Sequence, residues 1–102
     1  MKKIGFIGLG NMGSKMVINL LNTNHEVIGY DVNEKLIDQL IPKGLKKASN
    51  LNEIINDIDI IITMLPNGEI VEKVYESILN KLKSNILLVD WSTINVLVFT
   101  TD

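Results

Sequence analysis

The stretch GFIGLGNMG places glycines at positions 8, 10 and 13, in the spacing G-x-G-x-x-G, directly after an apolar run. That run, residues 3–8, is nearly free of polar side chains, as in a parallel strand that is buried on both faces. Residues 12–21 then carry methionine, valine and leucine side chains on one helical stripe. A glycine turn between a buried strand and an amphipathic helix is typical of the first unit of a parallel α/β sheet. This turn therefore constrains the fold more than any other feature of the chain.

The rest of the chain repeats this alternation of strands and helices. Four further strands are predicted at 26–30, 45–48, 58–65 and 86–90. The strand at 45–48 is weak and is expected at an edge of the sheet. Three further helices are predicted at 33–41, 50–55 and 70–82. Strands that alternate with helices imply right-handed crossovers and a mainly parallel sheet. We therefore predict an α/β chain with a Rossmann-type, doubly wound sheet that is truncated on its C-terminal side, where the last unit is missing.

One dinucleotide-binding domain is predicted over residues 1–94, because no linker, repeat or shift in composition divides them. Residues 95–102 carry no helical stripe and form an atypical tail. Two interpretations of the tail stay open: a native terminal strand, and a truncated or frame-shifted end. We favour the second.

Composition argues against several classes of partner. The net charge is −2 with acids and lysines interspersed, so the chain offers no basic surface for nucleic acid and no polybasic arm for a membrane. No apolar run has the length of a membrane span and the N-terminus is a poor signal peptide, which makes a cytoplasmic location the expectation. Cysteine is absent, so we expect no thiolate metal site and no cysteine nucleophile. The single histidine, His25, is expected to be structural, and no metal ligand is predicted.

Each glycine of the turn has its own expected role in binding a dinucleotide. The first permits the tight bend, the second lets the backbone approach a pyrophosphate, and the third lets the helix pack closely on the sheet. Asp31 ends the next predicted strand, where its carboxylate can accept hydrogen bonds from an adenosine ribose and would repel a 2′-phosphate. The chain has lysines but no arginine, the usual clamp for that phosphate. NAD is therefore the predicted cofactor, unless Asp31 only caps the next helix and the glycines serve packing alone.

Four segments together resemble the β-hydroxyacid dehydrogenases, a family that includes 6-phosphogluconate dehydrogenase: GFIGLGNMGSKM, HEVIGYD, ITMLP and DWSTI. The resemblance covers residues 2 to about 94 and is greatest to the 3-hydroxyisobutyrate dehydrogenases of that family. It implies that the glycine turn holds the pyrophosphate, that the acid after the second strand selects NAD, and that the segment after the fourth strand lies along the cofactor. The implied cofactor residues are Gly8, Leu9, Gly10, Asn11, Met12, Gly13, Asp31, Leu65, Pro66 and Thr93. The implied substrate residues are Ser92 and Thr93, whose other interpretation is a polar cap on a following helix.

The resemblance also implies a reaction and a limit to it. The family transfers hydride from small 3-hydroxyacids to NAD; 3-hydroxyisobutyrate would give methylmalonate semialdehyde, a step of valine degradation. The family's catalytic lysine belongs to a later helical domain that also forms the subunit interface, and no lysine here matches its motif. We therefore predict no catalytic residue in this chain and no turnover by it alone. With that domain absent, exposed apolar surface is expected to favour self-association. Trp91 stands where the family has a small residue, which is expected to crowd the mouth of the pocket.

Two other functions stay open. The first is a catalytically inactive NAD-binding module, either a sensor or the remnant of a truncated gene. The second is a ligand-sensing domain of the kind attached to ion channels, which shares the glycine turn and the terminal acid. That second alternative does not predict MLP after the fourth strand or D-x-S-T after the fifth, so we rank it last.

Overall fold

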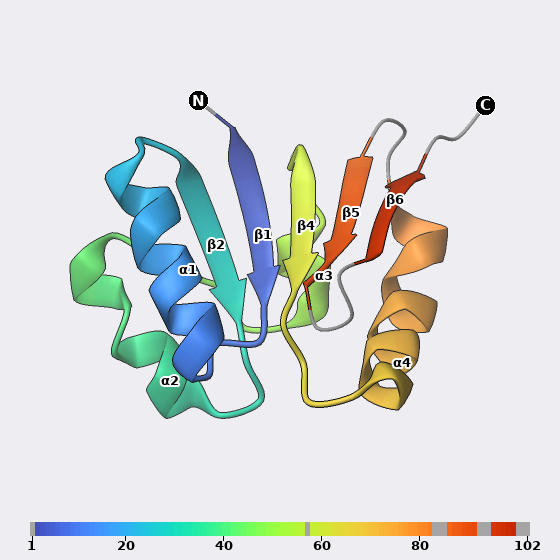
Figure 1. Ribbon diagram of the computed structural model, residues 1–102, viewed down its shortest axis with the longest axis horizontal. Coiled ribbons are helices and arrows are strands. Elements are labelled where there is room, and N and C mark those ends of the chain that lie inside the picture. The colour runs from blue at the N-terminus through green and yellow to red at the C-terminus, as the bar shows by residue number, and fades with distance from the viewer. Residues whose placement is uncertain (1, 57, 83–85, 92–94, 100–102) are drawn as a thin grey trace.

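The computed structural model describes residues 2–56, 58–82, 86–91 and 95–99, and this part of the chain forms one sheet with helices on both faces (Figure 1). The strand order is β3-β2-β1-β4-β5-β6. The strands are β1 (Lys3–Ile7), β2 (Glu26–Tyr30), β3 (Lys46–Lys47), β4 (Ile60–Thr63), β5 (Ile86–Asp90) and β6 (Asn95–Phe99). The helices are α1 (Asn11–Asn22), α2 (Glu34–Asp38), α3 (Leu51–Ile54) and α4 (Gly68–Ile78), with 3-10 turns at Ile41–Lys43 and Leu79–Lys81.

The predicted doubly wound α/β fold is confirmed. Strands β1 to β5 pair in parallel, and β6 pairs antiparallel with β5. The chain runs outward from β1 to β3 on one side of the sheet, then returns past β1 to β4 and runs outward on the other side. The connections that follow β1 and β4 consequently leave the sheet toward opposite faces, and they do so from neighbouring strands.

Two apolar clusters fix the helices to opposite faces of the sheet. On one face, Phe6 of β1 packs with Val17 of α1 and Ile37 of α2. On the other face, Ile61 of β4 packs with Ile78 of α4. All five side chains are at most 1% exposed. Successive side chains of a strand point to opposite faces, so each strand contributes to both clusters.

The predicted elements differ from the observed ones mainly at their ends. Strands β2 and β5 have the predicted bounds. The predicted strand 58–65 is shorter at both ends, and the two residues that follow its observed end, Met64 and Leu65, line a cleft. The predicted helix 33–41 ends at Asp38, because Pro42 has no N–H to continue the helix and supports only a 3-10 turn, which ends at Gly44 with φ of 112°.

Asparagine caps set where the later helices begin. The Asn67 side chain accepts a hydrogen bond from the Ile70 N–H at 3.0 Å, so α4 begins at Gly68, earlier than predicted. Asn33 and Asn50 cap α2 and α3 in the same way. In the tail, residues 95–99 form a strand that pairs with β5.

Replacing Ile61 by alanine is expected to lower the free energy of unfolding by about 2–5 kcal/mol, because a fully buried side chain in a central strand would leave a cavity. Urea denaturation followed by circular dichroism measures this loss. Ile41→Ala is the matched control, since the Ile41 side chain is 43% exposed. Equal losses in the two variants would contradict the assignment of Ile61 to the core.

Candidate functional site

A cleft of ≈ 580 Å³ lies at the carboxyl ends of the strands, between the glycine turn and the segment that follows β4. The predicted cofactor residues that line it are Gly8, Gly10, Asn11, Met12, Gly13, Asp31, Leu65 and Pro66. Leu9 is the described exception, because its side chain is buried under the turn and only 1% exposed. Ser92 and Thr93 lie outside the described residues.

The position of the cleft follows from the strand order. β1 and β4 are neighbours, and the chain leaves them toward opposite faces of the sheet. The two connections therefore diverge and leave a crevice between them, which is where open parallel sheets bind their ligands.

Two of the three glycines are required by the fold itself. Gly8 has φ of 100°, and a Cβ there would lie 2.1 Å from the Met64 carbonyl oxygen. A Cβ on Gly13 would lie 2.2 Å from the Gly8 carbonyl oxygen. A side chain at either position would push α1 or the β4 connection away from the turn.

Gly10 differs from these two, because nothing within the chain requires it. Its φ of −68° suits any residue, and a Cβ there would meet no atom within 4 Å. Gly10 is the N-cap of the twelve-residue helix α1, whose first-turn N–H groups have no partner within a helix. A missing side chain at this point leaves space for a group to approach those N–H donors, and the dipole of the helix favours an anion there. The turn therefore fits a pyrophosphate.

Asp31 joins the two loops at the mouth of the cleft. Its Oδ2 accepts a hydrogen bond from the Leu9 N–H at 2.8 Å, and its Oδ1 accepts one from the Asn33 N–H at 2.8 Å. The N-cap of α2 is Asn33 and not Asp31, since the Asn33 side chain accepts from the Lys35 N–H. Each carboxylate oxygen of Asp31 keeps a further lone pair, which a ribose hydroxyl can use.

The walls of the cleft are apolar. Among the described lining residues Asp31 is the one charged side chain, and neither lysine nor histidine is present. Val32, Met12 and Ile70 are large lining side chains with exposed fractions of 89%, 59% and 37%. Flat apolar walls with a few polar groups suit the planar bases of a dinucleotide.

Sequence reasoning did not identify several lining residues. These are Ile7, Tyr30, Val32, Leu36, Met64, Ile70 and Val74. Most of them follow a strand end or begin a helix, so their place beside the predicted residues was a usable signal. Trp91, which was expected to crowd the mouth, is 45% exposed and does not line the cleft.

The predictions on metal ligands, on His25 and on membrane spans concern residues away from the cleft. Among the described residues no group of three or more histidine, cysteine or acidic side chains could hold a metal ion. His25 directly precedes β2, at the amino ends of the strands and away from the cleft. Its Nδ1 accepts a hydrogen bond from the Lys2 N–H at 3.1 Å. In the described part of the chain, no helix has the length and apolar character to cross a membrane.

Residues 3–100 match the family model described as the NAD binding domain of 6-phosphogluconate dehydrogenase. The chain is 41% identical over 100 residues to 3-sulfolactaldehyde reductase of Escherichia coli (strain K12). The matched region covers 95% of this chain and 34% of that protein. It is 39% identical over 97 residues to the probable mitochondrial 3-hydroxyisobutyrate dehydrogenase of Dictyostelium discoideum. That matched region covers 92% of this chain and 30% of that protein. The chain thus spans about a third of the length of these relatives.

Solved structures give the same result. The 3-hydroxyisobutyrate dehydrogenase of Mycobacterium tuberculosis, with L-serine, superposes with a TM-score of 0.85 at 34% identity, over 88% of this chain and 31% of that one. An imine reductase variant from Myxococcus stipitatus in complex with NAD+ has a TM-score of 0.82 at 18% identity, over 88% of this chain and 31% of that one, and supports the fold alone. These matches confirm the resemblance and NAD as the cofactor of the family, while the roles of single residues stay predictions.

Gly10→Leu is expected to weaken NAD binding by at least about tenfold, because the added side chain would occupy the space above the first turn of α1. Calorimetric titration measures the affinity, and circular dichroism checks the fold. Gly68→Leu is the matched control, since a Cβ at Gly68 also meets nothing within 4 Å and Gly68 does not line the cleft. A folded Gly10→Leu variant with undiminished affinity would contradict the pyrophosphate assignment.

Asp31→Ala is expected to weaken NAD binding more than NADP binding, because it removes both a ribose acceptor and the charge that repels a 2′-phosphate. The variant also lacks the hydrogen bond from the Leu9 N–H, which should lower the affinity for both cofactors by a smaller and equal amount. The ratio of the two dissociation constants isolates the first effect. Glu34→Ala controls for general charge, since it removes an acid of α2 that does not line the cleft. Equal loss for both cofactors would leave Asp31 with the loop-holding role alone.

Proposed function

Because this chain belongs to the NAD-binding domain family of 6-phosphogluconate dehydrogenase, we propose that it is the cofactor-binding part of an oxidoreductase that oxidises 3-hydroxyisobutyrate, or a similar small 3-hydroxyacid. The products would be methylmalonate semialdehyde, NADH and a proton, as in valine degradation. A cytoplasmic location is part of the same proposal.

The observation that carries the proposal is the open position at Gly10, at the start of α1 and in the wall of the cleft. There the N–H groups of the first turn would donate to the pyrophosphate. Asp31 would accept from the adenosine ribose, and Leu65 and Pro66 would lie along the cofactor. The bound nicotinamide supplies the acceptor for hydride, and the chain's contribution is to hold it in place and keep water from one side of it.

The substrate class is supported by the names of two relatives. One is a 3-hydroxyisobutyrate dehydrogenase and the other a 3-sulfolactaldehyde reductase, so both names denote a small molecule with an anionic end and an oxidisable or reducible carbon. The hydroxyls of Ser92 and Thr93 would donate hydrogen bonds to that anionic end. A carboxylate and a sulfonate both accept such bonds, which is why we propose the class together with its first member.

A second candidate function is an NAD-binding module without catalysis. It is favoured by one observation, the lack of lysine and histidine among the described residues that line the cleft. Asp31 is held by two backbone N–H groups at the adenosine end, where it could not serve the reacting carbon. A general acid or base would then have to come from outside the described cleft.

Calorimetric titration with NAD and, separately, NADP tests the binding function. We expect saturable binding with NAD preferred, and loss of that binding in Gly10→Leu. Absence of binding by a folded sample would overturn the proposal.

A second titration tests the substrate. 3-Hydroxyisobutyrate is added to the NAD-loaded chain while the fluorescence of Trp91, the single tryptophan, is followed. Saturable change that is weaker in Ser92→Ala supports the oxidoreductase, whereas NAD binding with no response to the hydroxyacid supports the module. NADH formation is recorded in parallel, and we expect none from this chain alone.

A further inference from the structure

We propose that Asp90 is a positioning residue that, with Thr63 and Tyr75, holds the end of β5 against the end of β4 and against the helix that walls the cleft. The inference rests on the proposed function, because Asp90 and Trp91 lead along the chain directly into the predicted substrate residues Ser92 and Thr93. The three residues are called the strand-end cluster below.

The strand-end cluster is polar and buried. Thr63 is fully buried and Asp90 is 5% exposed, and these two are the buried polar residues of the described core. The Thr63 hydroxyl donates to the Asp90 Oδ1 at 3.1 Å. A carboxylate in the core is costly unless hydrogen bonds hold it, so this pair has one preferred arrangement.

The register places the cluster where two functional segments begin. Thr63 and Asp90 face each other as the last parallel pair of β4 and β5. One residue later, the Trp91 N–H donates to the Thr63 carbonyl at 2.8 Å. Side chain and backbone thus clamp the same point. In the sequence the cleft-lining Met64 follows Thr63, and the predicted substrate residue Ser92 comes two positions after Asp90.

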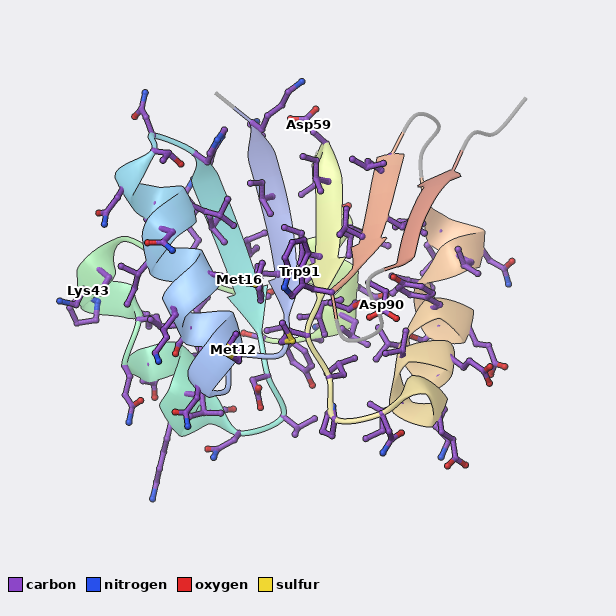
Figure 2. All side chains as sticks on the ribbon, viewed as in Figure 1. Met12, Met16, Lys43, Asp59, Asp90 and Trp91 are labelled. Atoms are coloured by element: carbon purple, nitrogen blue, oxygen red, sulfur yellow. The ribbon has the colours of Figure 1, made fainter. Side chains whose placement is uncertain are left out.

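The third member ties the clamp to α4. The Tyr75 hydroxyl lies 3.4 Å from the Thr63 hydroxyl, and the same helix contributes Ile70 and Val74 to the cleft wall. In the view of Figure 2, Asp90 lies on the side of α4, and Trp91 lies over the middle of the sheet. Burial raises the pKa of Tyr75; the hydrogen bond with Thr63 lowers that pKa and the charge of Asp90 raises it, so the three groups are electrostatically linked.

The clamp therefore fixes three described parts relative to each other: the cleft wall from α4, the residue Met64 after β4, and Trp91 after β5. Removing the Thr63 hydroxyl would remove its contacts with Asp90 and Tyr75 and leave the backbone ladder. The expected result is a folded chain in which Trp91 takes more than one position.

The main test follows Trp91 directly by fluorine NMR, with 5-fluorotryptophan in place of the single tryptophan. We expect one line in the unchanged chain and a shifted or split line in Thr63→Val. Thr63→Ser restores the hydroxyl and should restore the original line. Thr23→Val is the matched control, because its hydroxyl bonds to carbonyls at the end of α1, far from the cluster. An unchanged line in Thr63→Val, or equal shifts in Thr63→Val and Thr63→Ser, would overturn the proposal.

Adding NAD to the same samples distinguishes a failure of this proposal from a failure of the proposed function. NAD is added to each labelled sample, with calorimetry on the same samples to measure binding. We expect NAD to shift the Trp91 line in the unchanged chain and to shift it less in Thr63→Val that still binds NAD. An identical response in the two chains overturns the clamp and leaves NAD binding intact. If no sample binds NAD, the proposed function fails, and the lines recorded without NAD still decide on the clamp.

If the Thr63→Val variant does not fold, the proposal is tested instead by an absorbance titration of tyrosine. In a Tyr30→Phe background Tyr75 is the single tyrosine. Asp90→Asn should lower the pKa of Tyr75, because it removes a negative charge, and Thr63→Ser should leave that pKa close to its original value. An unchanged pKa in Asp90→Asn would show that the cluster is not linked and would overturn the proposal.

Discussion

The approach of Gly8 to the Met64 carbonyl is the contact from which the rest of the site follows. It brings the turn after β1 against the connection after β4, and a side chain of any size would separate them. Gly13 packs on the Gly8 carbonyl in turn, so the start of α1 is placed by the same contact. The position of the cleft, the direction of α1 and the space above Gly10 all depend on two glycines that pack closely against backbone.

Asp31 gives the site its second constraint. Its two oxygens hold the loop after β1 and the loop after β2 through backbone N–H groups, and the same oxygens face the mouth of the cleft. The observed support of the turn and the predicted selection between cofactors therefore involve the same carboxylate. A change of cofactor preference at this position would need a new donor set for the turn as well as a new partner for the phosphate.

Much of the fold could be predicted because apolar runs and asparagine caps are local signals. β2 and β5 have their predicted bounds, and Asn50, the first residue of the predicted helix 50–55, caps α3. The end of β4 could not be predicted, because Met64 and Leu65 have strand-like side chains but line the cleft. Periodicity reports whether a residue is apolar, not whether it faces a core or a ligand.

Eight of the predicted cofactor residues line one cleft, because they belong to short motifs at the ends of neighbouring strands, and their roles stay predictions. Leu9 is the exception, since its side chain belongs to the core and only its N–H reaches Asp31. The strand-end cluster lay outside sequence reasoning for a different reason. Thr63, Tyr75 and Asp90 come from three elements, and only the register of β4 with β5 and the packing of α4 bring them together.

The reversed direction of β6 has a consequence for the route of the chain. Asn95 pairs with Asp90 and Phe99 with Ile86. β6 therefore carries the backbone away from the cleft, toward the end of the sheet at which β1 and the other parallel strands begin (Figure 1). A strand of five residues covers about 17 Å. An affinity tag or surface tether attached at either Lys2 or Phe99 would therefore leave from the far side of the molecule, and the chain could be immobilised with its cofactor cleft facing the solution.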